Sequence, residues 1–257
     1  RLAGAETLAV ARPQDQRWAT VYETGELRGL FPRGAGRYDI GSGLAVRPPV
    51  AGTARFSGDA VVWNGVRGRR LALRQEEVRF RSRDGVLLAG TLMIPPGGGK
   101  HPAVAIIHGS GATDRGVEAA RTDYFAARGF VVLSYDKRGV AQSGGTWPGE
   151  GATQRAVDLY ARDAEAGARF LAAQPEVDPA RVGLAGASQA GWIMPLAASR
   201  EDAIRFLVLL VSPTVTQGES DDWGSRTGQG DHDPGNLAAI EAEVRRDGPS
   251  GFDPLPA

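Results

Sequence analysis

Cysteine is absent from this chain, and its absence excludes several kinds of chemistry. Without a thiol there is no disulfide, no thiolate zinc site, no iron–sulfur cluster and no cysteine nucleophile. Long apolar runs are also missing, since the longest is Phe206–Val211, far too short to cross a bilayer. The first residue is Arg1, and no leader with a charged and then an apolar part is visible, so the sequence leaves the compartment open.

Net charge is missing as well, because thirty basic and thirty acidic side chains cancel. We therefore expect neither nucleic acid nor an anionic membrane as the main partner. Lysine is scarce: Lys100 and Lys137 are the only two, and arginine supplies the other basic side chains. We interpret this scarcity as a bias of genome composition rather than as a functional signal.

The rest of the composition is ordinary for a globular protein. The 257 residues are 42% apolar and 23% charged, which suits one or two domains with a sizeable core. Residues 1–76 hold short apolar runs between glycine and proline, at 20–22, 43–46 and 60–63, without a helical period. This pattern predicts a small β-rich N-terminal domain, with a loosely ordered leader as the alternative.

From Glu77 the sequence predicts strands that alternate with helices. The expected strands are 77–80, 86–94, 103–107, 130–135, 181–185 and 206–211, and the expected helices are 118–128, 151–173 and 189–199. Such an order is typical of an α/β fold with a mostly parallel sheet and helices on both faces. We assign this domain to residues 77–257.

A glycine-rich turn at Gly186–Gly191 follows one of these buried strands and begins a helix. A serine on such a tight turn, here Ser188, has its hydroxyl lifted above the sheet, as a nucleophile requires. Small residues on both sides let the turn pack, although Ala190 stands where the pattern G-x-S-x-G has its last glycine. The alternative interpretation is a serine that only caps the helix.

A second turn, His108-Gly109-Ser110-Gly111, ends the first buried strand of the alternating region. Serine attack on a carbonyl places negative charge on its oxygen, which backbone N–H groups must face. We expect these N–H groups from Ser110 and from Gln189, the residue after the nucleophile. His108 is expected to support this turn rather than act as a base.

A third motif, with Asp136 and Arg138, follows the next buried strand and is expected to tie its loop together through charge-assisted hydrogen bonds. No complete phosphate-binding or dinucleotide motif is present, and no metal or organic cofactor is expected. Trp192 and Met194 either line an acyl pocket or belong to the core.

The order of these three motifs resembles the α/β-hydrolase superfamily, and more narrowly bacterial serine esterases related to dienelactone hydrolases and acyl-aminoacyl peptidases. Those proteins carry H-G-S-G, then Y-D-x-R-G-x-G-x-S, then G-x-S-x-G-G, and the resemblance covers Glu77–Thr214. It implies that Ser188 is the nucleophile and that Ser110 and Gln189 form the oxyanion hole. Residues 1–76 also resemble, weakly, the β-rich extension of some members.

The sequence departs from this family after the nucleophile, where the family has its acid and its histidine. The one later histidine is His232, in a stretch that resembles a cap or lid inserted at 213–257. We therefore expect the triad acid and base beyond residue 257, and this span alone to be nearly inactive. One alternative is that His232 is the base and that Glu219, Asp221 or Asp222 is the acid. Another is that the segment around His232 is only a solvated loop.

The sequence thus predicts a serine hydrolase that cleaves a carboxylic ester, a thioester or an amide through an acyl-enzyme on Ser188. Esters are favoured because residues 1–76 are too few for a propeller that filters peptides. A non-catalytic hydrolase-like binding protein and a serine peptidase of the acyl-aminoacyl peptidase type are the alternatives. The expected partner is a small acyl substrate, and the oligomeric state is left open.

Overall fold

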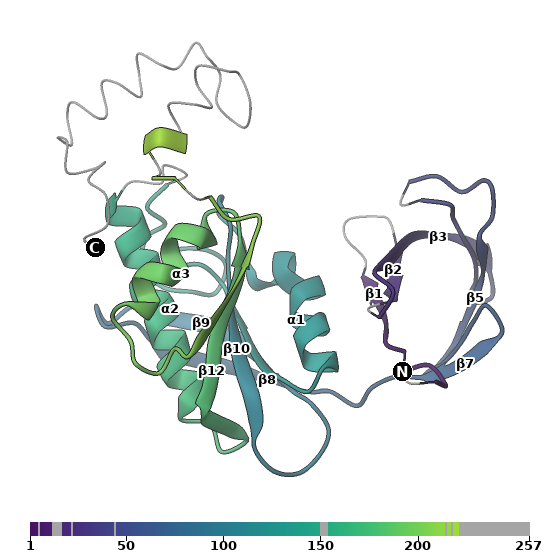
Figure 1. Cartoon of the computed structure of the whole chain (residues 1–257), viewed down its shortest axis with the longest axis horizontal. Coiled ribbons are helices and arrows are strands. Elements are labelled where there is room, and N and C mark those ends of the chain that lie inside the picture. Colours follow the sequence, from purple (N-terminus) through teal and green to yellow (C-terminus); the bar gives the residue numbers. More distant parts are fainter. Residues whose placement is uncertain are drawn as a thin grey trace.

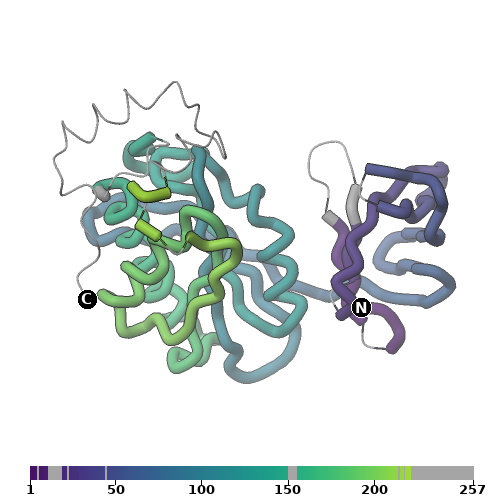
Figure 2. The backbone as a smooth tube through the Cα atoms, turned by 45° about the horizontal axis from the view of Figure 1, so that its top comes forward, coloured from purple at the N-terminus to yellow at the C-terminus, as the bar shows by residue number. Residues whose placement is uncertain are grey.

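The computed structural model describes residues 1–4, 6–11, 17–21, 23–43, 45–149, 154–213, 215–216 and 218–220. Their strands form two separate sheets, one of seven strands and one of six. Figures 1 and 2 show the first sheet as a curled ring and the second as the centre of a layered arrangement with helices. The change from one sheet to the other lies between Arg69 and Arg74, a few residues before the expected boundary at 76.

The first sheet is an antiparallel meander in chain order. Its strands are β1 (Leu8–Ala11), β2 (Arg17–Val21), β3 (Glu26–Gly34), β4 (Arg37–Ile40), β5 (Gly52–Ser57), β6 (Ala60–Trp63) and β7 (Val66–Arg69). Short turns permit this order. Between β6 and β7, for example, Asn64 and Gly65 have φ values of 48° and 84°, as a two-residue hairpin turn requires.

One face of this meander encloses a small core of its own. Every second residue along the strands points inward, and the buried side chains include Leu30, Ile40 and Trp63. Leu2 joins this core and forms an antiparallel bridge with Gly68 on β7. The first residues therefore lie against the last strand, which is why the sheet looks like a ring in Figure 1.

The second sheet has the order β13-β12-β10-β11-β9-β8. Its strands are β8 (Arg74–Arg81), β9 (Leu87–Ile94), β10 (His101–Ile107), β11 (Val131–Tyr135), β12 (Val177–Ala187) and β13 (Phe206–Leu210). The last four strands in the chain run parallel to one another, whereas β8 and β9 form an antiparallel hairpin and β9 also pairs antiparallel with β11. The sheet is thus mixed, with its parallel part where β10 to β13 lie.

Helices cover both faces of this sheet, as the alternation of strands and helices predicted. A 3₁₀ turn (Arg115–Glu118) leads into α1 (Ala119–Ala127), which packs on one face against side chains such as Val104 and Ile106. The opposite face carries α2 (Gln154–Ala172) and α3 (Ala190–Ala198) against Ala105 and Leu184. Figure 1 shows this division, and burial on both faces explains why residues 103–107 of β10 are all apolar.

Some expectations about single segments were wrong. The described residues of the run at 43–46, which are 43, 45 and 46, lie outside any strand, in the connection between β4 and β5. Strand β12 begins at Val177, earlier than expected, because Val177 already pairs with His101 on β10. The described part of the chain has no helix long and apolar enough to cross a membrane. Of the expected cap at 213–257, only 213, 215–216 and 218–220 are described.

Candidate active site

Ser188 lies on the tight turn between β12 and α3, with its side chain exposed. Its φ is +57°, in the left-handed region that costs a residue with a Cβ about 1–2 kcal/mol. Two hydrogen bonds hold it there: its N–H donates to the carbonyl of Leu210 (3.2 Å), and its own carbonyl accepts from the N–H of Gly191 (2.8 Å). Strained backbone that the surroundings enforce is characteristic of functional turns.

The small residues around Ser188 are required by close packing. A Cβ on Gly186 would lie 2.5 Å from the carbonyl oxygen of Ile107 and 2.6 Å from Cβ of Ala190. On Gly191, a Cβ would lie 2.6 Å from Cβ of Ser212. Because Gly186 has no side chain, the methyl group of Ala190 fits opposite it, which explains the alanine in place of the usual glycine.

The loop after β10 lies directly against this turn. A Cβ built on Gly109 would be 3.6 Å from Cβ of Ser188, so the backbone of the loop and the serine are neighbours. Next to Gly109, Ser110 is exposed. Within the described chain, no hydrogen-bond acceptor is found for the amide N–H of Ser110. Gln189 has helical dihedral angles at the N-terminus of α3, where the first amides lack partners within the helix.

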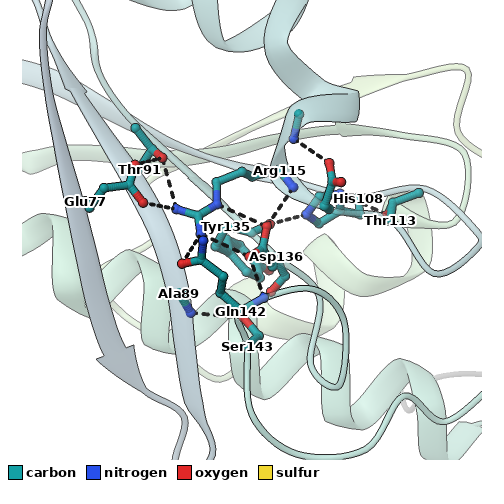
Figure 3. Close-up of polar contacts among 12 residues, drawn as sticks. Glu77, Ala89, Thr91, His108, Thr113, Arg115, Tyr135, Asp136, Gln142 and Ser143 are labelled. Atoms are coloured by element: carbon teal, nitrogen blue, oxygen red, sulfur yellow. Dashed lines mark hydrogen bonds and ion pairs between the residues drawn. The ribbon is translucent and has the colours of Figure 1, made fainter. Parts of the chain in front are cut away.

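His108 is buried behind this loop, and both of its ring nitrogens are engaged. Nε2 donates to the carbonyl oxygen of Tyr135, and Nδ1 accepts a hydrogen bond from the hydroxyl of Thr113 (3.1 Å). Burial lowers the pKa of His108 to about 4, so the ring is neutral near pH 7. Figure 3 shows the ring between the two partners, an arrangement that joins the β10 and β11 loops.

Asp136 anchors the loop after β11 rather than facing Ser188. Its carboxylate accepts from the side chain and the amide of Arg115 (3.0 Å each) and from the amide of Gln142 (3.1 Å). Burial alone would raise the pKa of Asp136, but these hydrogen bonds hold it below the usual value. Arg115 also donates to Glu77 and Thr91, so a single guanidinium joins three segments (Figure 3). Arg115 was not predicted from the sequence, because its partners are distant along the chain.

Arg138 is equally committed to structure. It forms a two-pronged pair with Asp163 on α2 (2.6 and 2.8 Å) and a further bond to Asp84 in the β8–β9 turn (2.8 Å). Arg138 and Asp163 are buried. The contact of Asp136 with the amide of Gln142 lies within the loop, as expected, whereas Arg138 joins the loop to α2 and to the β8–β9 turn.

Lys137, between these two residues, was not singled out from the sequence. Its side chain is buried, and its ammonium donates to the carbonyl oxygens of Gly109 (2.5 Å) and Gly111 (2.9 Å) and to Oε1 of Gln189 (3.2 Å). The same nitrogen lies 4.8 Å from the ring centroid of Tyr160. The signal that could have indicated it is the scarcity of lysine in an arginine-rich chain.

The remaining candidates lie away from this arrangement or outside the described residues. His232, Asp221 and Asp222 belong to the undescribed part. Glu219 is exposed, and its carboxylate accepts from the amide and hydroxyl of Thr216 (2.9 and 2.7 Å). Within the described residues no group of three or more His, Asp or Glu side chains is placed to hold a metal ion.

The two residues considered for an acyl pocket, Trp192 and Met194, differ in their exposure to solvent. Met194, a residue of α3, is fully buried in the core. Trp192 is half-buried, and its indole N–H donates to the carbonyl of Val215 (2.9 Å). A cavity of about 650 Å³ does exist in the molecule, but it lies between the first sheet and residues such as Leu73 and Met93, and Ser188 does not line it.

Comparison with known proteins places this arrangement in context. A sequence model of the family described as X-Pro dipeptidyl-peptidase (S15 family) matches residues 84–237. The chain is 33% identical over 142 residues to the polyketide transferase claH of Penicillium crustosum (54% of this chain, 44% of that protein). It is 32% identical over 139 residues to the thiohydrolase aneE of Aspergillus aculeatus (54% and 42%).

A solved structure, that of DcsB in complex with its substrate analogue, shares the fold. It is 20% identical, with a TM-score of 0.50, and the match covers 71% of this chain and 57% of that one. The match to claH and aneE, the two curated relatives named above, covers less than half of the length of each.

Proposed function

The chain belongs to the X-Pro dipeptidyl-peptidase (S15) family of α/β-hydrolases, and from this premise we propose that it is the part of a serine hydrolase that carries the nucleophile, Ser188. The resemblance to the α/β-hydrolase superfamily seen in the sequence motifs is confirmed. One observation carries the proposal for Ser188: an exposed serine with φ of +57° on the strand-to-helix turn, in contact with a glycine-rich loop.

In the proposed reaction, the hydroxyl oxygen of Ser188 attacks the carbonyl carbon of an ester. A base takes the hydroxyl proton, and the negative charge on the carbonyl oxygen is stabilised by the amides of Ser110 and Gln189. The alcohol leaves with that proton, and an acyl-enzyme remains. Water then attacks the acyl carbon, and the carboxylic acid is released while the serine regains its proton.

The base is not supplied by the histidines of the described chain. Both nitrogens of His108 are engaged, as described above, and His101 lies at the start of β10, whereas the proposed site lies at the end of that strand. Within the sequence, His232 is the other histidine. The triad histidine of the proposed reaction therefore comes from outside the described residues.

Amide substrates are the second candidate, and the family match supports them, since its description names an X-Pro dipeptidyl-peptidase. Thioesters are the third candidate substrate, which the similarity to a curated thiohydrolase supports. A p-nitrophenyl ester, a thioester and an X-Pro p-nitroanilide, assayed side by side, separate these substrates. A ratio of kcat/KM that favours the anilide would overturn the proposed preference for esters.

The role of Ser188 is tested with the protein at its natural length and the variant Ser188→Ala. We expect the variant to lose at least ~10³-fold in kcat, because loss of a triad serine removes the covalent route. Ser199→Ala is the matched control: its hydroxyl bonds to the carbonyl of Leu196 (2.8 Å) at the other end of α3. Equal ester turnover by wild type and Ser188→Ala would contradict the proposal and favour the non-catalytic alternative.

A further inference from the structure

The buried ammonium of Lys137 connects the two segments that hold the proposed oxyanion donors. On one side it donates to the carbonyl oxygens of Gly109 and Gly111, which flank Ser110. On the other side it donates to the side-chain oxygen of Gln189. An ammonium has three N–H donors, and these three acceptors lie within 3.2 Å of the nitrogen.

The bond to Gly109 fixes the direction of the Ser110 amide. The carbonyl of Gly109 and the N–H of Ser110 belong to one planar trans peptide unit, so they point in opposite directions. Because the carbonyl faces Lys137, the N–H faces away from it. The same peptide begins at Gly109, and a Cβ built on that residue would lie 3.6 Å from Cβ of Ser188.

This loop needs such an anchor because its own residues restrain it little. Gly109 and Gly111 have no side chains, and Gly111 has φ of +89°, a conformation open to glycine at little cost. Ser110 between them is exposed. A buried charge that holds the carbonyls on both sides therefore limits the rotation of the peptide that carries the donor.

The chemistry of lysine suits this position better than that of arginine. An ammonium is a compact charge that three converging oxygens can surround, whereas a guanidinium is a flat fork that suits carboxylates. A cation on a peptide carbonyl also polarises the N–H of the same peptide, and it does so more strongly in a buried site. The presence of a lysine at position 137, in a chain that otherwise uses arginine almost throughout, therefore has a structural reason.

We propose that Lys137 is a positioning residue of the oxyanion hole, which holds the Ser110 amide and the turn at Gln189 in register above Ser188. This inference rests on the proposed function, since an oxyanion hole has a role only in acyl transfer. In this proposal Lys137 does not contact the substrate. It acts through the two segments that it joins.

The test compares an ester with its thionoester, in which sulfur replaces the carbonyl oxygen, on the natural-length protein. Sulfur accepts hydrogen bonds weakly, so an oxyanion hole in good order favours the ester. For Lys137→Met we expect kcat on the ester to fall about 10- to 100-fold. Removal of an oxyanion donor itself lowers kcat by about 10²- to 10³-fold, so the expected effect is no larger than that. KM should change little, and the ester-to-thionoester rate ratio should fall about tenfold.

Two further variants complete the design. Lys137→Gln retains N–H donors without the charge and should lie between wild type and Lys137→Met. Lys100→Met is the matched control, because Lys100 is the other lysine of the chain and donates to the carbonyl of Val177 (3.2 Å), at the opposite end of the sheet. It should leave both the rates and the ratio unchanged.

The rate ratio does not depend on how much of a variant is folded, so a loss of stability cannot imitate the effect. A wild-type ratio in both Lys137 variants would overturn the inference, even if total activity fell, while the proposed function would stand. Full activity of Ser188→Ala would overturn both. A lowered ratio in Lys137→Met with an intact ratio in Lys100→Met supports the inference.

Discussion

At the scale of single residues, the turn at Ser188 depends on where a Cβ atom finds space. Gly186 and Ala190 lie opposite each other, and together they leave room for one methyl group. The backbone of Gly109 fills the neighbouring space beside Ser188. A change of one methyl group at this point therefore affects both packing and the position of the hydroxyl.

Gly186→Ala tests this packing. The added methyl would lie 2.5 Å from the carbonyl oxygen of Ile107, closer than real contacts allow, so the turn must shift. We expect the free energy of unfolding in urea to fall by about 1–3 kcal/mol and ester turnover to fall with it. Gly98→Ala is the control, because a Cβ there meets nothing within 4 Å; equal loss in both variants would contradict the packing argument.

The candidate residues differ in how far the sequence could predict them. Ser188, Ser110 and Gln189 were placed on their turns because local glycine patterns indicate such turns, and their roles stay proposals. Lys137 and Arg115 could not be found in that way. Their partners lie on other loops, and sequence spacing does not predict contacts between distant loops.

At the scale of elements, the buried pair of Arg138 and Asp163 links the loop after β11 to α2. Both side chains are nearly excluded from solvent, with exposures of 4% and 2%. Asp84 adds the β8–β9 turn to the same guanidinium. The guanidinium of Arg138 thus joins the loop after β11, the helix α2 and the β8–β9 turn.

We expect Arg138→Met to lower the free energy of unfolding by about 3–5 kcal/mol, because it leaves the carboxylate of Asp163 buried without its partner. The double variant Arg138→Met/Asp163→Leu should recover part of this loss. The control is Arg70→Met, whose pair with Asp59 is 74% and 81% exposed and contributes ~0–1 kcal/mol. Urea titrations decide, and equal effects of Arg138→Met and Arg70→Met would contradict the argument.

The elements themselves were predictable to different degrees. Residues 103–107 of strand β10 are all apolar because helices cover both faces of the sheet, and this pattern indicated a buried strand. In contrast, β3 was missed: most of its residues are partly or fully exposed, and it holds arginines and a proline. Strands of this small meander have few buried positions, so their sequence pattern is weak.

At the scale of the whole molecule, the two sheets have separate cores. The first core includes Leu2, Leu30 and Trp63, whereas the second sheet is packed on both faces by its own helices. The chain passes from one to the other once, between Arg69 and Arg74. Each part thus has apolar contacts sufficient to define its own structure.

We expect residues 1–72, produced alone, to fold. The measurement is a ¹H–¹⁵N NMR spectrum, which should show dispersed amide signals and a cooperative loss of them on heating. The fragment 6–72, which lacks the bridge between Leu2 and Gly68, should melt at a lower temperature. A collapsed, undispersed spectrum of residues 1–72 would show that the meander depends on the second part.

The backbone at Ser188 has a consequence for how such a protein can change over generations. Glycine adopts φ of +57° without the steric cost that a Cβ brings. A library screened for heat tolerance alone would therefore reward the replacement of the one side chain that we propose performs the chemistry. Durability and turnover are opposed at this position, and only selection for turnover can keep the serine.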